Sequence, residues 1–528
     1  MAEFKHRKKA PCQEACPAGV DVPRYIRYLK AGRYGEALGV IRESMPFPGV
    51  CGYACLHPCE LKCARTQYDE PVGIRLLKRA AYEMGSLDLL PEPEALPPTG
   101  KKVAVIGAGP CGLSAAYYLA RQGHKVTVYE ARPLAGGMLR YAIPAFRLPR
   151  EVIEQEIAWI LLTGVEIKTS HPVRSASELL SREYDAVFAA SGAWAPKRSG
   201  LEVSGIAKVV DALAFLTGVN SGQVQSVNGK VVVIGGGNTA LDAARAALRL
   251  GAEEVILLYR RTRSEMPADP EEVRDAESEG VTLEFQAAPL KLINDQLFCT
   301  KTGERGTDGK PLILPGSEFS LQCDFLIEAV GLSADAQALE LPGNPDGTVQ
   351  TDSRLYSAGK PGIFAAGDVV TGPSSIIQAI SQGKAAASSI DRFLGGSGLE
   401  ETAGKTDLEF GATLPLGSTR PGVRKIPPAG RIKGFALVEQ GFDRAETLQE
   451  AGRCLGCDVH TYQVDVNFSC CKDCAYCREV CGLGVFETSL TFNSGGYRPM
   501  LASQPEKCVG CLKCMMICPD FAISVSET

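Results

Sequence analysis

Eight cysteines near the end of the chain stand in two runs with the same spacing, C-x2-C-x2-C-x3-C. A loop of this spacing presents three thiolates to one 4Fe-4S cluster, and the fourth cysteine of each run binds the other cluster. We therefore predict two clusters, with Cys518 completing the first and Cys481 the second. The repeat of one pattern argues against zinc. The predicted ligands are Cys471, Cys474, Cys477, Cys481, Cys508, Cys511, Cys514 and Cys518.

A second group of cysteines lies within the first 90 residues. The run CGYACLHPCELKC places four thiols at intervals of four residues, and Cys16 is followed by Pro17. This density favours iron-sulfur clusters over a tetrahedral zinc ion, and a structural zinc site is the alternative. The candidate ligands are Cys12, Cys16, Cys51, Cys55, Cys59 and Cys63.

Residues 103–130 read VAVIGAGPCGLSAAYYLARQGHKVTVYE, the pattern of a strand, a glycine turn, an amphipathic helix and a second strand ending in an acid. In such a β-α-β unit Gly107 permits the tight turn, Gly109 lets the backbone approach a pyrophosphate, and Gly112 lets the helix pack on its strand. Glu130 stands where a carboxylate accepts hydrogen bonds from a ribose. We predict a dinucleotide site, and a glycine-rich turn of another α/β fold is the alternative.

A second β-α-β unit begins at Lys230 with KVVVIGGGNTALD. Its turn is a G-x-G-x-x-A variant made by Gly235, Gly237 and Ala240. Its second strand ends in arginines, where guanidinium groups pair with the 2′-phosphate of NADP(H) and an acid would repel it. We predict FAD in the first unit and NADP(H) in the second, and a solvated arginine pair is the alternative. The arginines are Arg260, Arg261 and Arg263.

The later stretch GIFAAGDVVTGPSSIIQ returns the chain to the first unit. Gly367 and Asp368 precede a helix with Gln378 in its first turns, so Asp368 can bond a flavin ribityl chain while the helix N-terminus faces the flavin ring. We therefore expect an FAD domain interrupted by an NADP(H) domain.

The fold class is α/β, with two Rossmann-like dinucleotide-binding domains, an N-terminal α-helical iron-sulfur domain and a C-terminal α+β ferredoxin-like domain. Asp21 and Pro23 predict one helix that Gly32 ends, and residues 34–44 predict another. The expected domains are a helical domain at 1–90, an FAD domain at 101–195 and 335–395, an NAD(P) domain at 196–334, a linker and return segment at 396–457, and a ferredoxin-like domain at 458–528.

Residues 1 to about 457 resemble the glutamate synthase small-subunit family, which includes the N-terminal half of dihydropyrimidine dehydrogenase. The resemblance rests on the N-terminal cysteines, GGMLRYAIPAFRLP, GGGNTALD, YRR and AAGDV in the family's order. It implies FAD, NADP(H) and N-terminal 4Fe-4S clusters. No catalytic side chain is carried over, because hydride transfer from nicotinamide to flavin mainly needs positioning. The implied cofactor contacts are Gly107, Gly109, Glu130, Gly137, Met138, Arg147 and Asp368 for FAD, and Asn238, Thr239, Arg260, Arg261 and Arg263 for the nicotinamide nucleotide.

The chain departs from this family in its cluster ligands. Members open with E-A-x-R-C-x-x-C, which is missing at the start here but occurs late in the chain as EAGRCLGC. We hypothesise a split ligand set in which Cys454 and Cys457 join Cys12 and Cys63. The second N-terminal cluster would use Cys16, Cys55 and Cys59. Because Lys78 replaces the family's Gln or Glu ligand and is a poor ligand, we assign Cys51 as the fourth.

Composition narrows the function classes. A net charge of -5 argues against a nucleic-acid-binding protein. The sequence contains no run of 18 or more apolar residues, so we expect no membrane-spanning helix. The polar start MAEFKHRKK lacks the apolar segment of a secretory signal, so we expect a cytoplasmic protein. Twenty cysteines are then better explained as metal ligands than as disulfides.

Together these parts predict a converter between two-electron and one-electron carriers. We expect an NAD(P)H-dependent FAD iron-sulfur subunit that exchanges electrons with ferredoxin or with the clusters of a partner oxidoreductase, for example a 2-oxoacid oxidoreductase. The alternatives are a true glutamate synthase small subunit and, in a different class, a non-catalytic electron-wire adaptor. A disulfide reductase is excluded because no C-x4-C follows the first glycine turn and Cys111 stands alone.

Overall fold

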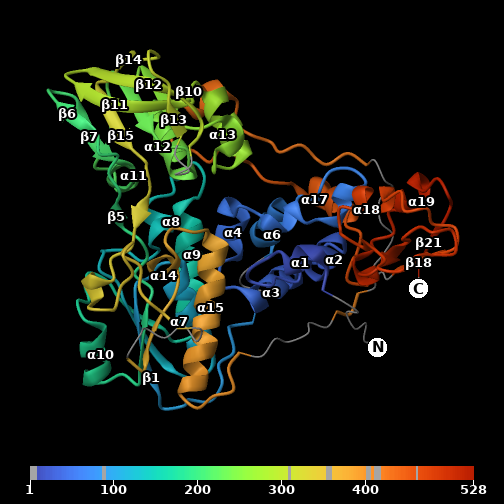
Figure 1. Ribbon diagram of the computed structural model, residues 1–528. Helices are drawn as coiled ribbons and strands as arrows, with labels where there is room; N and C mark the ends of the chain where they lie inside the picture. Colours follow the sequence, from blue (N-terminus) through green and yellow to red (C-terminus); the bar gives the residue numbers. More distant parts are fainter. Residues whose placement is uncertain are drawn as a thin grey trace.

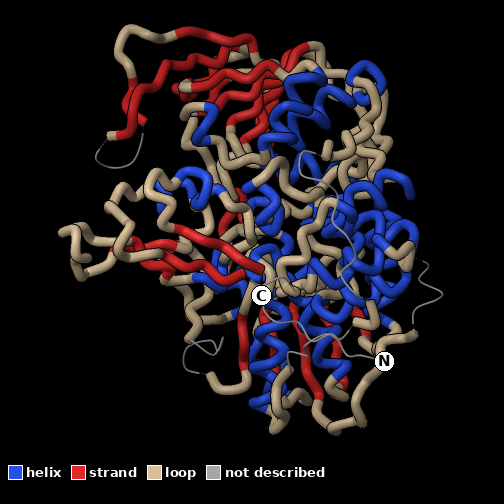
Figure 2. Tube along the Cα trace, turned by 90° about the vertical axis from the view of Figure 1, so that its right-hand side faces the viewer, coloured by secondary structure: helices blue, strands red, loops and turns tan. Residues whose placement is uncertain are grey.

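The computed structural model describes residues 9–85, 91–306, 311–352, 360–399, 406–408, 418–459 and 462–527. The first residues of the predicted polar start and parts of the predicted return segment lie outside these ranges. Figure 1 shows a lower and an upper lobe at one side, helices in the middle and a small module at the far side. In Figure 2 the large sheets lie at opposite ends of the molecule, with helices between them.

The lower lobe is built on a parallel sheet of order β17-β4-β1-β2-β3. The strands β1, β4 and β17 are mostly buried apolar runs because helices cover the sheet. The strands are β1 (Lys102–Ile106), β2 (Lys125–Tyr129), β3 (Glu166–Lys168), β4 (Ala186–Ala189) and β17 (Ile363–Ala365). The helices are α7 (Pro110–Arg121), α8 (Met138–Tyr141), α9 (Arg150–Leu161), α10 (Ala176–Arg182), α14 (Asp368–Thr371) and α15 (Ile376–Phe393).

The upper lobe contains a second parallel sheet, of order β10-β9-β8-β15-β7. Its strands are β7 (Lys208–Asp211), β8 (Lys230–Ile234), β9 (Glu254–Tyr259), β10 (Thr282–Phe285) and β15 (Phe325–Glu328). The helical elements are α11 (Ala212–Asn220), α12 (Asn238–Arg249), η3 (Arg263–Glu265) and α13 (Pro270–Glu279). The chain passes between the lobes through β5 (Ala195–Pro196) and β16 (Leu332–Ser333), which pair antiparallel. The short η4 (Gln337–Leu339) follows β16.

A further sheet in the upper lobe has no counterpart in the sequence-based expectations. Its order is β13-β12-β11-β6, with β14 also paired to β12. It packs through its own apolar cluster on one face of the second parallel sheet. The strands are β6 (Glu202–Ser204), β11 (Ala287–Ile293), β12 (Gln296–Arg305), β13 (Pro311–Ile313) and β14 (Phe319–Gln322).

The helical region precedes the lower lobe and shares one hydrophobic core with it. The two helices expected from the sequence are present as α2 and α3. Asp21 caps α2 by accepting a hydrogen bond from the Arg24 backbone N–H, and α3 ends before Pro46. The elements are α1 (Pro11–Glu14), α2 (Val22–Lys30), α3 (Tyr34–Ser44), α4 (Pro48–Ala54), α5 (Pro58–Leu61), η1 (Ala64–Gln67) and α6 (Ile74–Met84).

The C-terminal module has its own core of apolar side chains and cysteines. Two antiparallel strand pairs, β18 with β21 and β19 with β20, enclose it. The elements are β18 (Tyr462–Val466), α18 (Tyr476–Val480), β19 (Phe486–Thr488), β20 (Met500–Ala502), η5 (Pro505–Lys507), α19 (Lys513–Ile517) and β21 (Ile523–Glu527). No helix in the described ranges is both long and apolar enough to cross a bilayer.

The return segment carries the chain from the lower lobe back onto the helical region. It contains α16 (Pro428–Arg431) and α17 (Arg444–Gly452), and α17 packs against α2. Arg453 is fully buried and donates hydrogen bonds to Asp69 and to the Glu70 carbonyl. Directly after the segment, both Asp458 oxygens accept hydrogen bonds from Arg27, at 2.6 and 3.0 Å.

Removing one partner of this buried pair should loosen the return segment. Asp458→Ala leaves the Arg27 guanidinium buried without its carboxylate, and we expect a loss of about 3–5 kcal/mol in stability. The measurement is the thermal melting temperature of the purified protein. Asp407→Ala is the matched control, because its ion pair with Arg33 is exposed and should contribute little. Equal melting temperatures for the two variants would contradict the prediction.

Candidate functional site

A cavity of about 550 Å³ opens at the carboxyl ends of β1 and β2 in the lower lobe. This volume suits a large organic cofactor. The cavity lies beside the N-terminus of α7, the helix that connects β1 to β2. Parallel sheets bind dinucleotides at this position. The predicted FAD contacts that line it are Gly107, Gly109, Glu130, Gly137, Met138 and Asp368.

The glycines of this cavity are required by close backbone contacts. Gly107 has φ +104°, and a Cβ there would lie 2.5 Å from the Ala190 carbonyl oxygen. A Cβ on Gly112 would lie 2.0 Å from the Gly107 carbonyl oxygen, which explains how α7 packs so near β1. Gly137 has φ +54°, and a Cβ there would lie 2.8 Å from the Gly109 Cα. The two glycine turns therefore form one bare backbone surface that fits a pyrophosphate.

The two acids of the cavity are held by backbone groups. Glu130 is buried, and its carboxylate accepts hydrogen bonds from the N–H groups of Ala108 and Arg132, both at 2.8 Å. Asp368 accepts hydrogen bonds from the Ser374 backbone N–H at 3.1 Å and from its hydroxyl at 2.7 Å. Burial raises the pKa of Asp368, and the two bonds from Ser374 oppose that rise. Both carboxylates are thus oriented before a ligand arrives.

Two predicted flavin contacts are not among the residues that line the cavity. Arg147 donates to Asp242 of α12 at 2.7 and 2.9 Å, so this guanidinium ties the lower lobe to the upper lobe instead of lining the cavity. Gln378 forms the capping box of α15 with Ser375. One helical turn further on, Gln382 accepts a hydrogen bond from the Gly367 N–H at 2.7 Å.

Sequence reasoning missed an aromatic wall of the cavity. The Arg132 guanidinium lies 4.1 Å from the centroid of the Trp194 ring and 4.8 Å from that of Tyr141. Arg132 and Trp194 both line the cavity, although they come from different turns. The only signal was the position of Arg132 two residues after Glu130.

The second glycine turn has the same backbone constraints. Gly235 has φ +149°, and a Cβ there would lie 2.4 Å from the Ala329 carbonyl oxygen. Gly237 precedes α12 and faces open space, which leaves room for a phosphate at the helix N-terminus. The Asn238 side-chain oxygen accepts a hydrogen bond from the Asp269 N–H at 3.0 Å, so the turn is held by the start of α13. Thr239 lies in the first turn of α12, and Ala240 is fully buried.

The three arginines after β9 differ in their surroundings. Arg260 is exposed. Arg261 is half-buried, and its buried Nε has no hydrogen-bond partner within the described ranges, which suits an anionic ligand. Arg263 already forms an ion pair with Glu277 and lies 5.5 Å from the Phe285 ring centroid. Arg260 and Arg261 are therefore the arginines best placed to receive a phosphate.

Four thiols from distant parts of the chain line one pocket in the helical region. Cys12 follows the first described residues, Cys63 precedes η1, and Cys454 and Cys457 arrive with the return segment. These are the four residues of the hypothesised split ligand set. We call this group site II. Burial raises the pKa of Cys12, and the thiols of Cys63, Cys454 and Cys457 raise it further, as expected for close thiols that would share a cationic cluster.

A second group of thiols surrounds a buried lysine on α6. Burial lowers the pKa of Lys78, but its thiol neighbours more than reverse this and hold it above the usual range. We call the group site I, and Cys51 stands in it with the three thiols predicted from the family. Its members are Cys16, Cys51, Cys55 and Cys59.

The C-terminal module also holds two groups of thiols. One pocket of the module, which we call site III, is lined by Cys481 and by the first three cysteines of the second run. The fourth cysteine of the first run therefore lies with the cysteines of the second run. In the other group burial raises the pKa of Cys477 to about 11, and its thiol neighbours include Cys518 of the second run. This crossing is the arrangement that the spacing predicts. Site III is Cys481, Cys508, Cys511 and Cys514, and site IV is Cys471, Cys474, Cys477 and Cys518.

Within the described ranges no three His, Cys, Asp or Glu side chains converge closely enough to hold a single metal ion. The ligands of a 4Fe-4S cube bind different iron atoms and therefore need not converge on one point. Four thiols around a shared pocket fit such a cube.

Contacts between elements place the four sites in sequence. Ser381 of α15, near the flavin cavity, donates to the Pro17 carbonyl beside Cys16 at 2.7 Å. At the other end of the helical region, the Tyr68 hydroxyl donates to the Val509 carbonyl in site III at 3.1 Å. Burial raises the pKa of Tyr68, and the nearby thiols of sites II and III raise it further. Cys59 of site I is also among the thiols that act on Cys12 of site II, so sites I and II are neighbours. The order is thus flavin cavity, site I, site II and site III, and site IV shares the core of the C-terminal module with site III.

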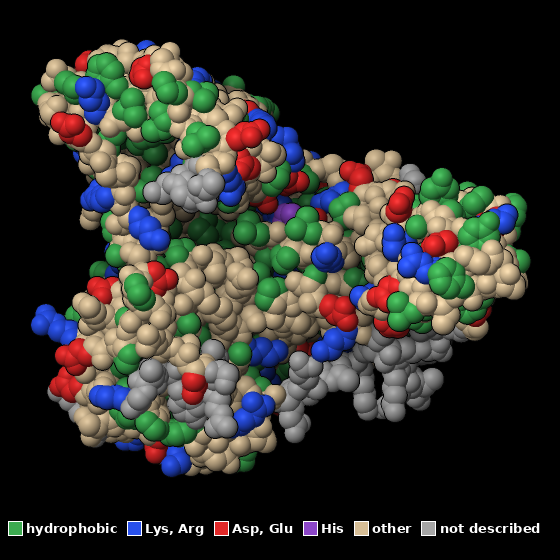
Figure 3. Space-filling model, in the orientation of Figure 1, with side chains coloured by type: hydrophobic (Ala, Val, Ile, Leu, Met, Phe, Trp, Pro, Cys, Tyr) green, Lys and Arg blue, Asp and Glu red, His purple; other side chains and the backbone are tan. Residues whose placement is uncertain are grey.

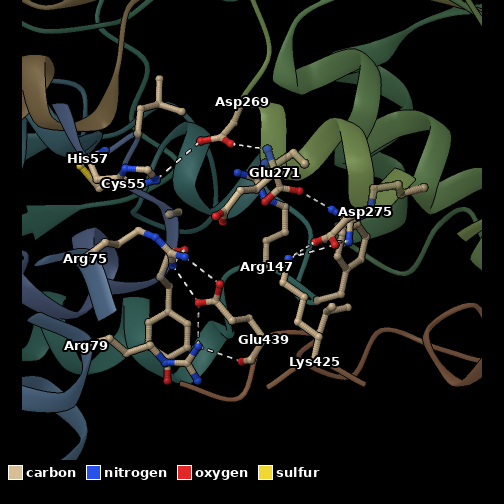
Figure 4. Close-up of a pocket in the computed structure, with 17 residues that line it drawn as sticks. Cys55, His57, Arg75, Arg79, Arg147, Asp269, Glu271, Asp275, Lys425 and Glu439 are labelled. Carbon is tan, nitrogen blue, oxygen red and sulfur yellow. Dashed lines mark hydrogen bonds and ion pairs between the residues drawn. The ribbon is translucent and has the colours of Figure 1, made fainter. Parts of the chain in front are cut away.

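A charged pocket lies where the upper lobe meets the helical region and the return segment. Figure 3 shows a hollow between the upper lobe and the parts beneath it, with charged side chains on its walls. In Figure 4, Arg75 pairs with Glu439 at 2.7 Å, and Lys425 pairs with Asp275 at 2.8 Å. His57, in the loop between two site I cysteines, lies 3.7 Å from Asp269. These contacts across the pocket join the upper lobe to the helical region and to the return segment.

Comparisons with known proteins agree with these sites. The family described as pyridine nucleotide-disulphide oxidoreductase matches residues 101–383. The dihydropyrimidine dehydrogenase domain II, 4Fe-4S cluster, matches residues 6–87, and a 4Fe-4S binding domain matches residues 504–524. The glutamate synthase [NADPH] small chain of Escherichia coli is 33% identical, over 72% of this chain and 88% of its own.

The chain belongs to the glutamate synthase small-chain family. It is an NAD(P)H-dependent oxidoreductase with FAD and iron-sulfur clusters, as the sequence predicted. Two beta subunits are also similar to it. The NADP(+)-dependent formate dehydrogenase subunit beta of Moorella thermoacetica is 42% identical over 86% of this chain and 71% of its own. The NADPH-Fe(3+) oxidoreductase subunit beta of Geobacter sulfurreducens is 36% identical over 86% of this chain and 76% of its own.

Proposed function

We propose that this protein is the NADP(H)-linked subunit of a larger oxidoreductase and conducts electrons between the nucleotide and a partner subunit. The observation that carries the proposal is the order of the four thiol sites from the flavin cavity to the C-terminal module. When bound, the flavin exchanges electron pairs with the nicotinamide and single electrons with the clusters. The protein's own residues position these groups and separate them from water.

Each lobe has a defined task in this proposal. The bare glycine turns of the lower lobe hold the FAD pyrophosphate, and Glu130 accepts hydrogen bonds from its ribose. The glycine turn before α12 holds the NADP(H) phosphates. The ion pairs of Arg147 with Asp242 and Glu272 keep the lobes together, so the nicotinamide can be positioned against the flavin ring. The same proposal keeps the expected domain boundaries, with β5 and β16 as the connection between the lobes.

The partner follows from the C-terminal module. Sites III and IV lie in an appended module, where they can reach a second protein. The two similar beta subunits match more of this chain than the glutamate synthase small chain does. We therefore favour a beta-type role, in which a partner with ferredoxin-type clusters carries the substrate site. A cytoplasmic location belongs to this proposal, because thiolate ligands need reducing surroundings.

Cofactor content tests the proposal. Protein purified without oxygen should contain one FAD and about 16 iron atoms per chain, and NADPH should reduce both the flavin and the clusters. The measurements are iron and flavin counting and the absorbance change on adding NADPH. A protein that binds FAD but leaves its clusters oxidised would overturn the proposed conduction.

The arginines after β9 should decide the choice of nucleotide. Replacing Arg260 and Arg261 by glutamine removes two charge-assisted bonds to the 2′-phosphate, each contributing about 1.5–3 kcal/mol. We expect kcat/KM for NADPH to fall by about 100-fold or more, while kcat/KM for NADH changes little. Arg263→Gln is the control, since Glu277 already pairs with Arg263. Equal activity of the unaltered protein with both nucleotides would show that these arginines do not read the phosphate.

A further inference from the structure

Lys78 is a buried lysine without a carboxylate partner. It lies on α6 with 3% of its surface exposed. Its ammonium has no hydrogen bond or ion pair among the described residues, and the negative groups that act on it most strongly are the thiols of site I. An uncompensated ammonium in a protein interior is strongly destabilising. Something at site I must therefore supply the opposite charge.

The neighbouring cations on the same helix are compensated in a different way. Arg75 pairs with Glu439 at 2.7 Å, and Arg79 pairs with Glu83 at 2.7 Å. Both guanidinium groups line the charged pocket. Lys78 lies one turn after Arg75 and directly before Arg79, but it faces thiols instead of carboxylates. Its charge is thus directed at site I alone.

Close packing keeps the lysine in this place. α4 carries Cys51 and ends directly before Cys55, and it lies directly against α6. A Cβ on Gly52 would lie 2.8 Å from the Arg79 Cα, so the two helix backbones nearly touch there. The Lys78 ammonium and the thiols of Cys51 and Cys55 are therefore held on one closely packed helix pair.

We propose that Lys78 is the counter-charge of the cluster at site I and raises that cluster's reduction potential. The inference rests on the proposed cluster ligands. Four thiolates around a 4Fe-4S core give a net negative group, and its charge grows by one when an electron arrives from the flavin. A fixed cation stabilises the more negative, reduced form. The electron is the only species transferred, and no proton moves. Lys78 thus favours transfer from the flavin to the first cluster of the series.

Redox titration of the full-length protein tests this role. The cluster potentials are measured by electron paramagnetic resonance in the unaltered protein and in Lys78→Met, Lys78→Gln and Lys78→Arg. In both neutral variants one midpoint potential should become more negative by about 59 mV. For a one-electron couple, this shift corresponds to a tenfold change in the equilibrium constant. Lys78→Arg keeps the positive charge, so its midpoint potentials should equal those of the unaltered protein. Lys384→Met is the control, because that lysine donates to the Ser44 carbonyl and lies over the Tyr118 ring.

The outcomes separate this inference from the proposed function. Unchanged midpoint potentials in both neutral variants, with full iron content, would overturn the role of Lys78 and leave the cluster sites standing. An unaltered protein that lacks a cluster at site I would instead overturn the proposed ligands. If the neutral variants lose about four iron atoms and Lys78→Arg keeps them, the required cation is confirmed. Loss of iron in all three variants would show that the cluster needs the exact lysine side chain and not only its charge. That result would overturn the proposed counter-charge role.

Discussion

A protein that ends at Val459 is expected to keep NADPH-driven dye reduction and to lose transfer to its partner. The truncation removes sites III and IV but retains the flavin cavity, sites I and II, and the ion pair of Arg27 with Asp458. The module has its own core, so its removal should not unfold the remainder. Small dyes collect electrons from the flavin directly, whereas a protein partner needs a cluster close to its own.

Iron content and two activities measure this effect. The truncated protein should contain about 8 of about 16 iron atoms, dye reduction should stay within about twofold, and reduction of ferredoxin should fall to background. The matched control is the full-length Cys470→Ser variant, since Cys470 is exposed and belongs to none of the four sites. If the truncated protein still reduces ferredoxin at the full rate, the outlet lies in the helical region and the order of the sites is wrong.

Cys454→Ser is expected to remove one cluster from the middle of the series. Cys454 is buried in site II and reaches Cys12 and Cys63 only because the return segment folds back. With one thiolate lost, the cluster should fail to assemble or lose iron, so the content should drop by about four atoms per chain. Sites III and IV would then be separated from the flavin.

The consequence for activity is specific. Reduction of ferredoxin should fall nearly as far as in the truncated protein, although sites III and IV are still present. Dye reduction should persist. Cys323→Ser serves as the control, because Cys323 is also buried but lies in the upper lobe, away from the four thiol sites. Unchanged iron content in Cys454→Ser would refute the split ligand set.

Local pattern determined the two glycine turns and the strands and helices beside them. The glycine turns, their strands and their helices appear where the sequence places them, and α3 begins at Tyr34 and ends at Ser44 as expected. The reason is that a turn with positive φ, a helix cap and a helix-ending proline act over a few residues. The C-terminal cysteine spacing is equally local, since each short loop brings three thiols together.

Other features depend on residues that are far apart in the chain. Nothing near Arg147 in the sequence indicates that its guanidinium will pair with Asp242. The added sheet of β6 and β11–β14 also forms by pairing strands that are separated in sequence.

Site II combines both kinds of information. The phrase EAGRCLGC resembles the opening phrase of the family, and its late position in the sequence predicts the split ligand set. Its arrival beside Cys12 and Cys63 depends on buried contacts between α17, Arg453 and the helical region. Such contacts join residues more than 380 positions apart. They follow from how whole surfaces pack, and no short stretch of sequence encodes that packing.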